Sequence, residues 1–287
     1  MKIATLGPKG TFSHEAVLKR DKLLDSKNPK GLEKSKTFQN KAEILFRNTV
    51  WDVFEAVDKD EVDEGVVPLE NSISGTIGLT VDALMEFDLN IVAEIILPIK
   101  HNLVGHDGVK DIETLYVHPV TYEQCEKFIR KTLPDVKIIQ TSSNAASAAI
   151  IAQKQDKTKA AIVPLGAIEI YGLKAIKKDI QDSKFNVTRF VVISKKEAKK
   201  TGRDRTSIAI YPQVDKPGLL YSLLGEFAKR KINLTKVESR PSKGKLGDYI
   251  FFIDIQGSKE DPKIKEAFKV IEENFFLKLL GSYPKEY

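Results

Sequence analysis

Short apolar runs alternate with amphipathic segments along the first two-thirds of the chain. The apolar runs predict strands at residues 2–6, 42–46, 64–69, 114–117, 136–140 and 159–163. Apolar positions spaced three or four residues apart predict helices at residues 13–20, 50–57, 76–87, 122–133 and 145–153. The alternation predicts two successive α/β units, each with a mostly parallel sheet covered by helices. An extended stretch at residues 91–104 joins them, which places a cleft between the units.

The charged segment from Lys195 to Arg205 marks a change in composition and predicts a linker. Beyond it, the pattern predicts a strand, a helix, two strands, a helix and a strand at residues 207–211, 219–230, 234–239, 249–256, 262–272 and 276–281. This βαββαβ order is ferredoxin-like. We therefore expect one region at residues 1–195, a linker at residues 196–204 and a smaller domain at residues 205–287.

Composition narrows the class of function. The 287 residues carry a net charge of +6, of which the segment 195–205 alone contributes +4, so the composition does not favour a nucleic-acid-binding surface. The single cysteine, Cys125, excludes an internal disulfide and a cysteine-built zinc site, and it is typical of a reducing compartment. No apolar run approaches the ~20 residues of a spanning helix, and the first residues do not resemble a signal peptide. We expect a cytoplasmic protein without a membrane partner.

Three strand-to-helix junctions are rich in Gly, Ser, Thr and Asn, at residues 7–13, 70–76 and 141–144. Free backbone N–H groups and the positive end of a helix dipole favour an anion at such a place, although each junction alone is also ordinary helix capping. Three of them in two facing units predict a ligand with a carboxylate or phosphate. The glycines match neither the phosphate loop nor the GxGxxG pattern, and the four histidines lack metal-ligand spacing, so neither a nucleotide nor a metal is expected.

Thr188, Arg189 and Phe190 stand directly before the apolar strand 191–193. One interpretation is structural: a β-prone threonine and a solvated arginine. The other is functional: Arg189 anchors a carboxylate while the Thr188 hydroxyl donates a proton or a hydrogen bond.

Three further side chains have structural explanations. The segment from Thr121 to Gln124 fits a capping box, which would explain Gln124. Cys125 is expected in the core, and His14 is expected on a helix surface.

In this order, the motifs resemble those of prephenate dehydratases that carry a C-terminal ACT regulatory domain. In the first part, the matching segments are Gly7–His14, Pro68–Ser72 with Gly75, His118–Pro119 with Gln124–Cys125, Ser143–Asn144 with Ala148, and Thr188–Phe190. In the last part, they are Pro217–Leu220 and Glu238–Pro241. The resemblance covers nearly all of the chain and is to the monofunctional form, without a preceding chorismate mutase helix bundle.

The resemblance implies an α/β fold like that of a type 2 periplasmic binding protein, with two lobes around a cleft and the Thr188 region returning to the first lobe. It implies conversion of prephenate to phenylpyruvate with Thr188 as the catalytic residue and without a cofactor. The substrate-binding residues that it implies are Thr11, Asn71, Ser72, Gly75, Thr76, Gln124, Ser143, Asn144, Arg189 and Phe190. Two alternatives stay open: arogenate dehydratase, and an amino-acid sensor without catalytic activity.

For the last domain, the resemblance implies that phenylalanine binds at a domain interface and inhibits the enzyme. The residues implied in effector binding are Gly218, Leu219, Leu220, Asn233, Glu238, Ser239, Arg240 and Pro241. Leu219 stands where many relatives have alanine, and a larger side chain there would narrow the effector pocket. ACT domains usually pair side by side, so a homodimer or homotetramer is expected.

Overall fold

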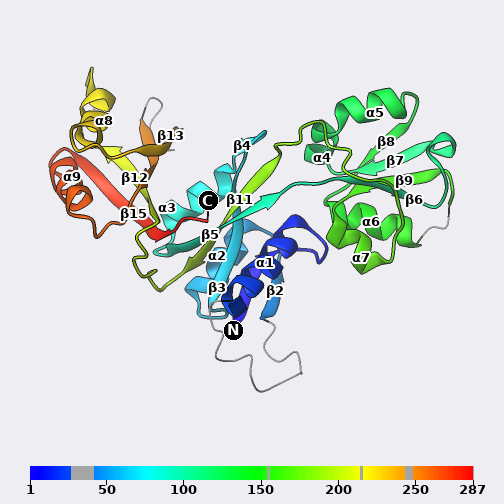
Figure 1. Ribbon diagram of the computed structural model, residues 1–287, viewed down its shortest axis with the longest axis horizontal. Coiled ribbons are helices and arrows are strands. Elements are labelled where there is room, and N and C mark those ends of the chain that lie inside the picture. Colours follow the sequence, from blue (N-terminus) through cyan, green and yellow to red (C-terminus); the bar gives the residue numbers. More distant parts are fainter. Residues whose placement is uncertain (27–41, 154–155, 214–215, 243–247, 287) are drawn as a thin grey trace.

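The computed structural model describes residues 1–26, 42–153, 156–213, 216–242 and 248–286. Three regions lie in a row, with the first lobe in the middle (Figure 1). Of the described residues, those within 1–98 and 186–194 form lobe 1, those within 102–177 form lobe 2, and those within 204–286 form the C-terminal domain. Among the described residues, no helix is long and apolar enough to cross a membrane, and no group of three His, Cys, Asp or Glu side chains is arranged to hold a metal.

Lobe 1 is built on a sheet with the strand order β2-β1-β3-β11-β5. Its strands are β1 (Lys2–Leu6), β2 (Glu43–Arg47), β3 (Glu64–Asn71), β5 (Asn90–Pro98) and β11 (Val187–Ser194), and the short β4 (Gly75–Thr76) pairs with the end of β3. β1 is parallel to β2 and β3, whereas β11 is antiparallel to both of its neighbours. The expectation of a mostly parallel sheet is therefore wrong, because β11 returns to this sheet from the opposite direction after the chain has passed through lobe 2.

Helices cover both faces of the lobe 1 sheet. α1 (Phe12–Ser26) packs on the face that carries Phe190 and Val192. α2 (Val50–Asp58) and α3 (Gly78–Glu86) pack on the other face, which carries Val191 and Ile193. α2 begins with a capping box: Thr49 Oγ1 accepts the Asp52 backbone N–H, and the Asp52 carboxylate accepts the Thr49 backbone N–H. Side chains thus alternate along β11 between two differently covered faces.

Lobe 2 has the strand order β10-β6-β9-β7-β8. Its elements are β6 (Asn102–Gly105), η2 (Val109–Asp111), β7 (Thr114–Val117), α4 (Pro119–Gln124), α5 (Glu126–Thr132), β8 (Lys137–Gln140), α6 (Asn144–Gln153), β9 (Lys159–Val163), α7 (Leu165–Tyr171) and β10 (Ala175–Lys177). The single helix expected over residues 122–133 is two short helices, because the backbone leaves helical geometry at Cys125 (φ −125°, ψ 13°). Cys125 is buried in the core, as expected.

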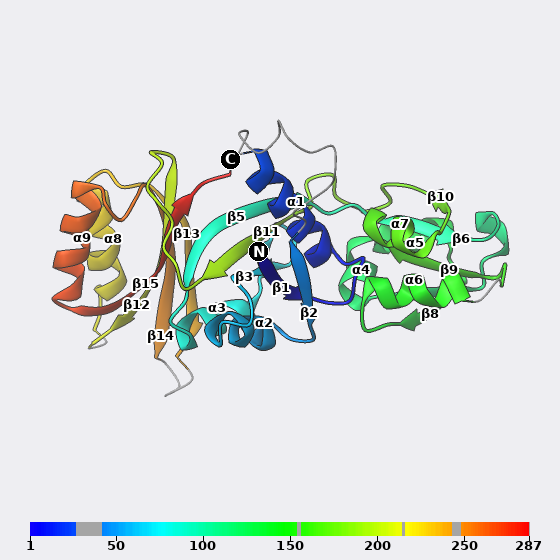
Figure 2. The same ribbon diagram turned by 90° about the horizontal axis from the view of Figure 1, so that it is seen from below.

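The C-terminal domain has the predicted βαββαβ order. Its elements are β12 (Asp204–Pro212), α8 (Leu219–Lys229), β13 (Leu234–Pro241), β14 (Tyr249–Gln256), α9 (Pro262–Glu272) and β15 (Phe275–Pro284), and its sheet has the order β13-β14-β12-β15. Figure 2 shows α8 and α9 on the outer face of this sheet and lobe 1 beside its inner face. At Gly281, a Cβ atom would lie 2.3 Å from the Ile91 carbonyl oxygen, so the two backbones approach each other as only glycine permits.

Candidate active site

Thr188 stands near the start of β11, directly opposite Asn71 at the end of β3. Its Oγ1 accepts a hydrogen bond of 2.9 Å from Asn71 Nδ2, and its side chain is almost completely buried. Asn71 Oδ1 accepts the backbone N–H groups of Ile73 and Ser74, both at 2.9 Å. These two bonds fix which end of the amide is the oxygen, so the amino group faces Thr188.

The hydrogen bonds continue from Asn71 to lobe 2. Asn71 Nδ2 lies 2.7 Å from Asn186 Oδ1, and Asn186 Nδ2 donates to Gln124 Oε1 at 2.9 Å. His101 Nε2 lies 2.8 Å from the same Gln124 oxygen. These five side chains form the Thr188 cluster: Thr188, Asn71, Asn186, Gln124 and His101. The cluster stands where both connections between the lobes pass.

His101 is held neutral in this cluster. Burial lowers its pKa, against the raising effect of its hydrogen bond to Gln124. Because the Gln124 oxygen is only an acceptor, His101 Nε2 carries the proton and donates it. Phe12 packs edge-on against the imidazole at a centroid distance of 5.4 Å, which holds the ring in place.

Gln124 is a member of the site rather than of a helix cap. α4 begins at Pro119 without a side-chain cap, and the Thr121 hydroxyl donates to Asn144 Oδ1 at 2.8 Å. The capping box expected at Thr121 to Gln124 is therefore wrong. Gln124 is buried, and its amide spans from Asn186 and His101 to Ser74 Oγ, which lies 3.4 Å from Nε2.

The junction at residues 70–76 is a strand hairpin and not a helix N-terminus. Asn71 pairs with Gly75, which has φ +79°, and α3 begins only at Gly78. Ser72 ties this hairpin to the chain that enters β11, because its hydroxyl donates to the Phe185 carbonyl and accepts the Val187 N–H. The predicted anion site on a helix dipole at this junction is therefore wrong.

The other two junctions are helix starts, one in each lobe. Ser143 Oγ accepts the Ala146 N–H at the beginning of α6, and the His14 N–H donates to Thr11 Oγ1 at the beginning of α1. His14 is buried, contrary to the expected surface position, and its Nδ1 accepts the Gly10 N–H. Burial lowers the pKa of His14, and the Lys9 charge lowers it further.

The two lobes touch beside the start of α1. Glu15 Oε1 accepts the Gly166 N–H of lobe 2 at 2.8 Å, and burial raises the pKa of this carboxyl against the lowering effect of that bond. A Cβ atom at Gly10 would lie 3.2 Å from the Ala167 Cα, so the loop before α1 lies directly against α7. The structure therefore places the loop with Thr11 at the contact between the lobes.

Arg189 does not belong to the Thr188 cluster, because successive side chains of β11 point to opposite faces. Its guanidinium contacts Glu70 at 2.8 Å, Glu94 at 3.2 Å, Asp254 at 2.7 Å and the Tyr283 hydroxyl at 3.0 Å. Burial lowers the pKa of Arg189, but these neighbours raise it more, and the group stays charged. The structure thus gives Arg189 four protein partners, and its predicted contact with the substrate stays a prediction.

Two other predicted substrate residues also lie outside the cluster. Phe190 is buried in the core beneath α1. Thr76 faces the C-terminal domain, where its hydroxyl bonds to the Glu238 carboxylate and accepts from Lys236 Nζ. A cavity of about 370 Å³ adjoins the cluster and is lined by Glu70, Asn71, Ser72, Ile96, Val187 and Arg189. A volume of this order suits a small ligand.

The predicted effector residues do not form one group within the chain. Both β12 and β13 pair with Phe251 of β14, through Ile210 and Ser239, so the turn after β12 with Gly218 to Leu220 and the segment Glu238 to Pro241 lie toward the same end of the sheet. Glu238 and Arg240 are turned toward lobe 1, where Arg240 approaches Asp82 at 3.5 Å.

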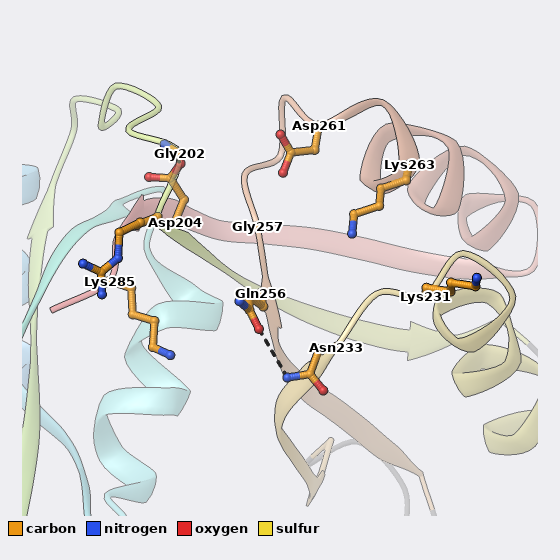
Figure 3. A pocket seen from close by; sticks show the side chains of 10 residues that line it. Gly202, Asp204, Lys231, Asn233, Gln256, Gly257, Asp261, Lys263 and Lys285 are labelled. Carbon is orange, nitrogen blue, oxygen red and sulfur yellow. Dashed lines mark hydrogen bonds between the residues drawn. The ribbon is translucent and has the colours of Figure 1, made fainter. Parts of the chain in front are cut away.

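Within this chain, Asn233 lies at the opposite end of the sheet from the other predicted effector residues, and its predicted role at a domain interface stays a prediction. It stands in a polar hollow of about 430 Å³, where its Nδ2 donates to Gln256 Oε1 at 3.4 Å (Figure 3). Two other residues line the same hollow: Asp204, the first residue of β12, and Gly257, which directly follows β14. Asn233, which directly precedes β13, is therefore separated from the Gly218 turn by the length of the strands.

Two α/β lobes, joined by two connections and followed by a βαββαβ domain, define a periplasmic-binding-protein-like enzyme core with an ACT-type domain. The family model of prephenate dehydratase matches residues 3–198, and the ACT domain model matches residues 213–273. The chain belongs to the prephenate dehydratase family. The predicted family, fold and carbon–oxygen lyase activity are confirmed, as is the return of the Thr188 strand to lobe 1.

Several relatives match along the whole chain. The prephenate dehydratase of Methanocaldococcus jannaschii is 41% identical over 96% of this chain and 96% of its own length. The bifunctional chorismate mutase/prephenate dehydratase of Aquifex aeolicus is 40% identical over 99% of this chain and 74% of its own length. The crystal structure of prephenate dehydratase in complex with L-Phe from Arthrobacter aurescens has a TM-score of 0.86 at 30% identity, covering 99% of this chain and 90% of that one.

Proposed function

We propose that this chain converts prephenate to phenylpyruvate with the Thr188 hydroxyl at the leaving oxygen. The observation that carries this role is the hydrogen bond from Asn71 Nδ2 to Thr188 Oγ1. Because that oxygen accepts from an amide of fixed orientation, its own proton is directed elsewhere, and no acceptor for it is present among the described residues. Donation to Oγ1 also polarises the Thr188 O–H and makes it a better donor.

The reaction needs orientation and one hydrogen-bond donor. The bond from the ring to its carboxylate breaks, and its electron pair makes the ring aromatic as carbon dioxide leaves. The ring C–O bond breaks at the same time, and the departing hydroxide takes up a proton to become water. A neutral site favours loss of the carboxylate charge, and the neutral His101, Gln124 and Asn186 around Thr188 supply such an environment.

The test is turnover of prephenate by the purified chain and by Thr188→Val. Phenylpyruvate is followed by its absorbance in strong base. Loss of one donor at a developing negative charge costs about 10²–10³-fold in kcat, and we expect a loss of this size with an unchanged melting temperature. A correctly folded valine variant with nearly normal turnover would exclude the role of Thr188. If the wild-type chain is inactive on prephenate but active on arogenate, arogenate replaces prephenate as the proposed substrate.

Phenylalanine is the proposed effector of the C-terminal domain. The proposal is supported by the ACT match and by the relative whose crystal structure contains L-Phe. We expect added phenylalanine to slow phenylpyruvate formation. Turnover that is unchanged by phenylalanine would contradict the proposed effector but not the proposed enzymatic activity.

The chain is proposed to form a homodimer or homotetramer through β13. This strand is at the edge of its sheet, and three apolar side chains near it are exposed: Leu220, Tyr221 and Val237. An open strand edge with exposed apolar side chains favours pairing with a second copy. Light scattering of the eluting protein would measure the mass, and a monomer at micromolar concentration would contradict the proposal. A cytoplasmic location stays a prediction.

A further inference from the structure

Lys236 of β13 reaches out of the C-terminal domain into lobe 1. Its Nζ lies 2.5 Å from Glu70 Oε2, 2.6 Å from Thr76 Oγ1 and 3.1 Å from Glu238 Oε2. The Lys236 side chain is only 15% exposed, so solvent screens these contacts weakly. These four residues, Lys236, Glu70, Thr76 and Glu238, are named the hairpin clamp.

The clamp is one residue pair away from the active site. Glu70 and Thr76 face each other across β3 and β4, and the next pair is Asn71 and Gly75. Because neighbouring side chains of a strand point to opposite faces, Glu70 is turned to the C-terminal domain while Asn71 is turned to Thr188. A shift of the hairpin at Glu70 must therefore move the Asn71 amide.

The same carboxylate also holds the strand of Thr188. Glu70 Oε1 accepts from Arg189 Nη1 at 2.8 Å, and Arg189 Nη1 lies 2.7 Å from Asp254 Oδ2 of the C-terminal domain. Asn71 and Thr188 are therefore each adjacent in sequence to a residue, Glu70 or Arg189, that is anchored on the face of the sheet toward the C-terminal domain. Lys236 and Asp254 are the partners that the C-terminal domain contributes to this anchoring.

We propose that Lys236 is a positioning residue for the Asn71–Thr188 hydrogen bond, and that it links this bond to the C-terminal domain. Lys236 separates two carboxylates, Glu70 and Glu238, that would otherwise face each other. Without its charge, repulsion between them pushes the hairpin out of place and turns Asn71 away from Thr188. Glu238 belongs to the proposed effector segment, so a ligand bound there acts on the same clamp. This regulatory part rests on the proposed function.

The primary test is Lys236→Met in the full chain, assayed without and with phenylalanine. Small displacements of catalytic groups can cost up to about 10²-fold, and we expect kcat to fall at least about 10-fold while KM stays within about twofold. We also expect inhibition by phenylalanine to weaken by a similar factor. The matched control is Lys229→Met, which removes an exposed lysine paired with Glu226 in the same domain and should leave kcat unchanged.

A second-site variant separates positioning from general damage. If repulsion between Glu70 and Glu238 displaces the hairpin, Glu238→Gln in the Lys236→Met background restores most of kcat in the absence of phenylalanine. A merely structural lysine gives no such rescue. An unchanged kcat in folded Lys236→Met, or a loss that Glu238→Gln does not relieve, overturns the proposal.

Two controls keep the test decisive. If Lys236→Met does not fold, Thr76→Val removes one partner of the ammonium at nearly constant volume, and its kcat must fall at unchanged KM. An unchanged kcat in Thr76→Val then overturns the positioning role. If the wild-type chain and Lys229→Met turn over prephenate equally well, a loss of kcat in Lys236→Met is not due to a failure of the proposed function. If the wild-type chain is inactive on prephenate, the proposed function itself is refuted.

Discussion

Replacing Arg189 by methionine tests the buried charges between lobe 1 and the C-terminal domain. The Arg189 side chain is 4% exposed and lies 3.2 Å from Glu94 and 2.7 Å from Asp254. Arg205 also approaches these acids, at 2.9 and 3.8 Å, so the variant has one guanidinium near both. Removing one partner of a buried ion pair costs about 3–5 kcal/mol. At roughly 2–4 °C per kcal/mol in chains of about this size, the melting temperature should fall by about 6–20 °C.

The loss of stability should also depend on pH, with a definite sign. Burial raises the pKa of Glu94, against the lowering effects of Arg205 and Arg189. Without Arg189 this pKa rises further, so the folded variant holds a proton that the unfolded chain releases near its ordinary pKa of about 4.3. Stability falls with rising pH where the folded state binds more protons. The deficit relative to wild type should therefore be smaller at about pH 5.5 than at about pH 8.

The assay is thermal unfolding followed by circular dichroism at both pH values. Arg130→Met is the matched control, because Arg130 pairs with Glu126 on α5 and its side chain is 75% exposed. Exposed pairs of this kind contribute at most about 1 kcal/mol. The reasoning is refuted if Arg189→Met melts within the range of the control, or if its deficit grows as the pH is lowered.

Two further predictions concern the Thr188 cluster. Asn71→Ala removes the donor to Thr188 Oγ1, and kcat for phenylpyruvate formation should fall by about 10²-fold; a loss below about fivefold would contradict the role of the amide. Burial lowers the pKa of His101 in the folded chain, so as the pH falls, the unfolded chain binds a proton on this residue before the folded chain does. The contribution of His101 to stability is therefore complete above about pH 6.5 and declines below it. His101→Gln, which still donates to Gln124, should make this decline of the melting temperature shallower, and an unchanged slope would contradict it.

Local pattern predicted most of the elements because their boundaries follow from apolar spacing and turn residues. The prediction failed where tertiary contacts determine the backbone conformation or the burial of a residue. The expected helix over residues 122–133 breaks at Cys125, which places the Gln124 amide in the Thr188 cluster. His14 was expected on a helix surface from its place in the sequence, but the approach of α7 and Phe46 to the start of α1 buries it.

The candidate site was predicted in part, because motifs mark residues but not their faces. Alternation along a strand already requires the Thr188 and Arg189 side chains to point to opposite sides, so the two do not join one hydrogen-bonded cluster. Asn186 and His101 were not singled out as site residues, and only the pairing of segments 117 residues apart brings Asn71 to Thr188 and to the nearby Asn186. Lys236 carried no sequence signal, because a lysine alternating with exposed residues on an edge strand is ordinary.

The position of β11 between β3 and β5 has a consequence for how the chain is made. Lobe 2 is an insertion, and β11, an interior strand of the lobe 1 sheet, is synthesised only after it. Until residue 194 has left the ribosome, β3 and β5 each have an unpaired apolar edge, which invites aggregation. The nascent chain can fold lobe 2 first, because its strands are close together in the sequence. Lobe 1 folds later, because β11 pairs with strands that are far away in the sequence. A truncation before Val187 should therefore leave an intact lobe 2 attached to an insoluble first lobe.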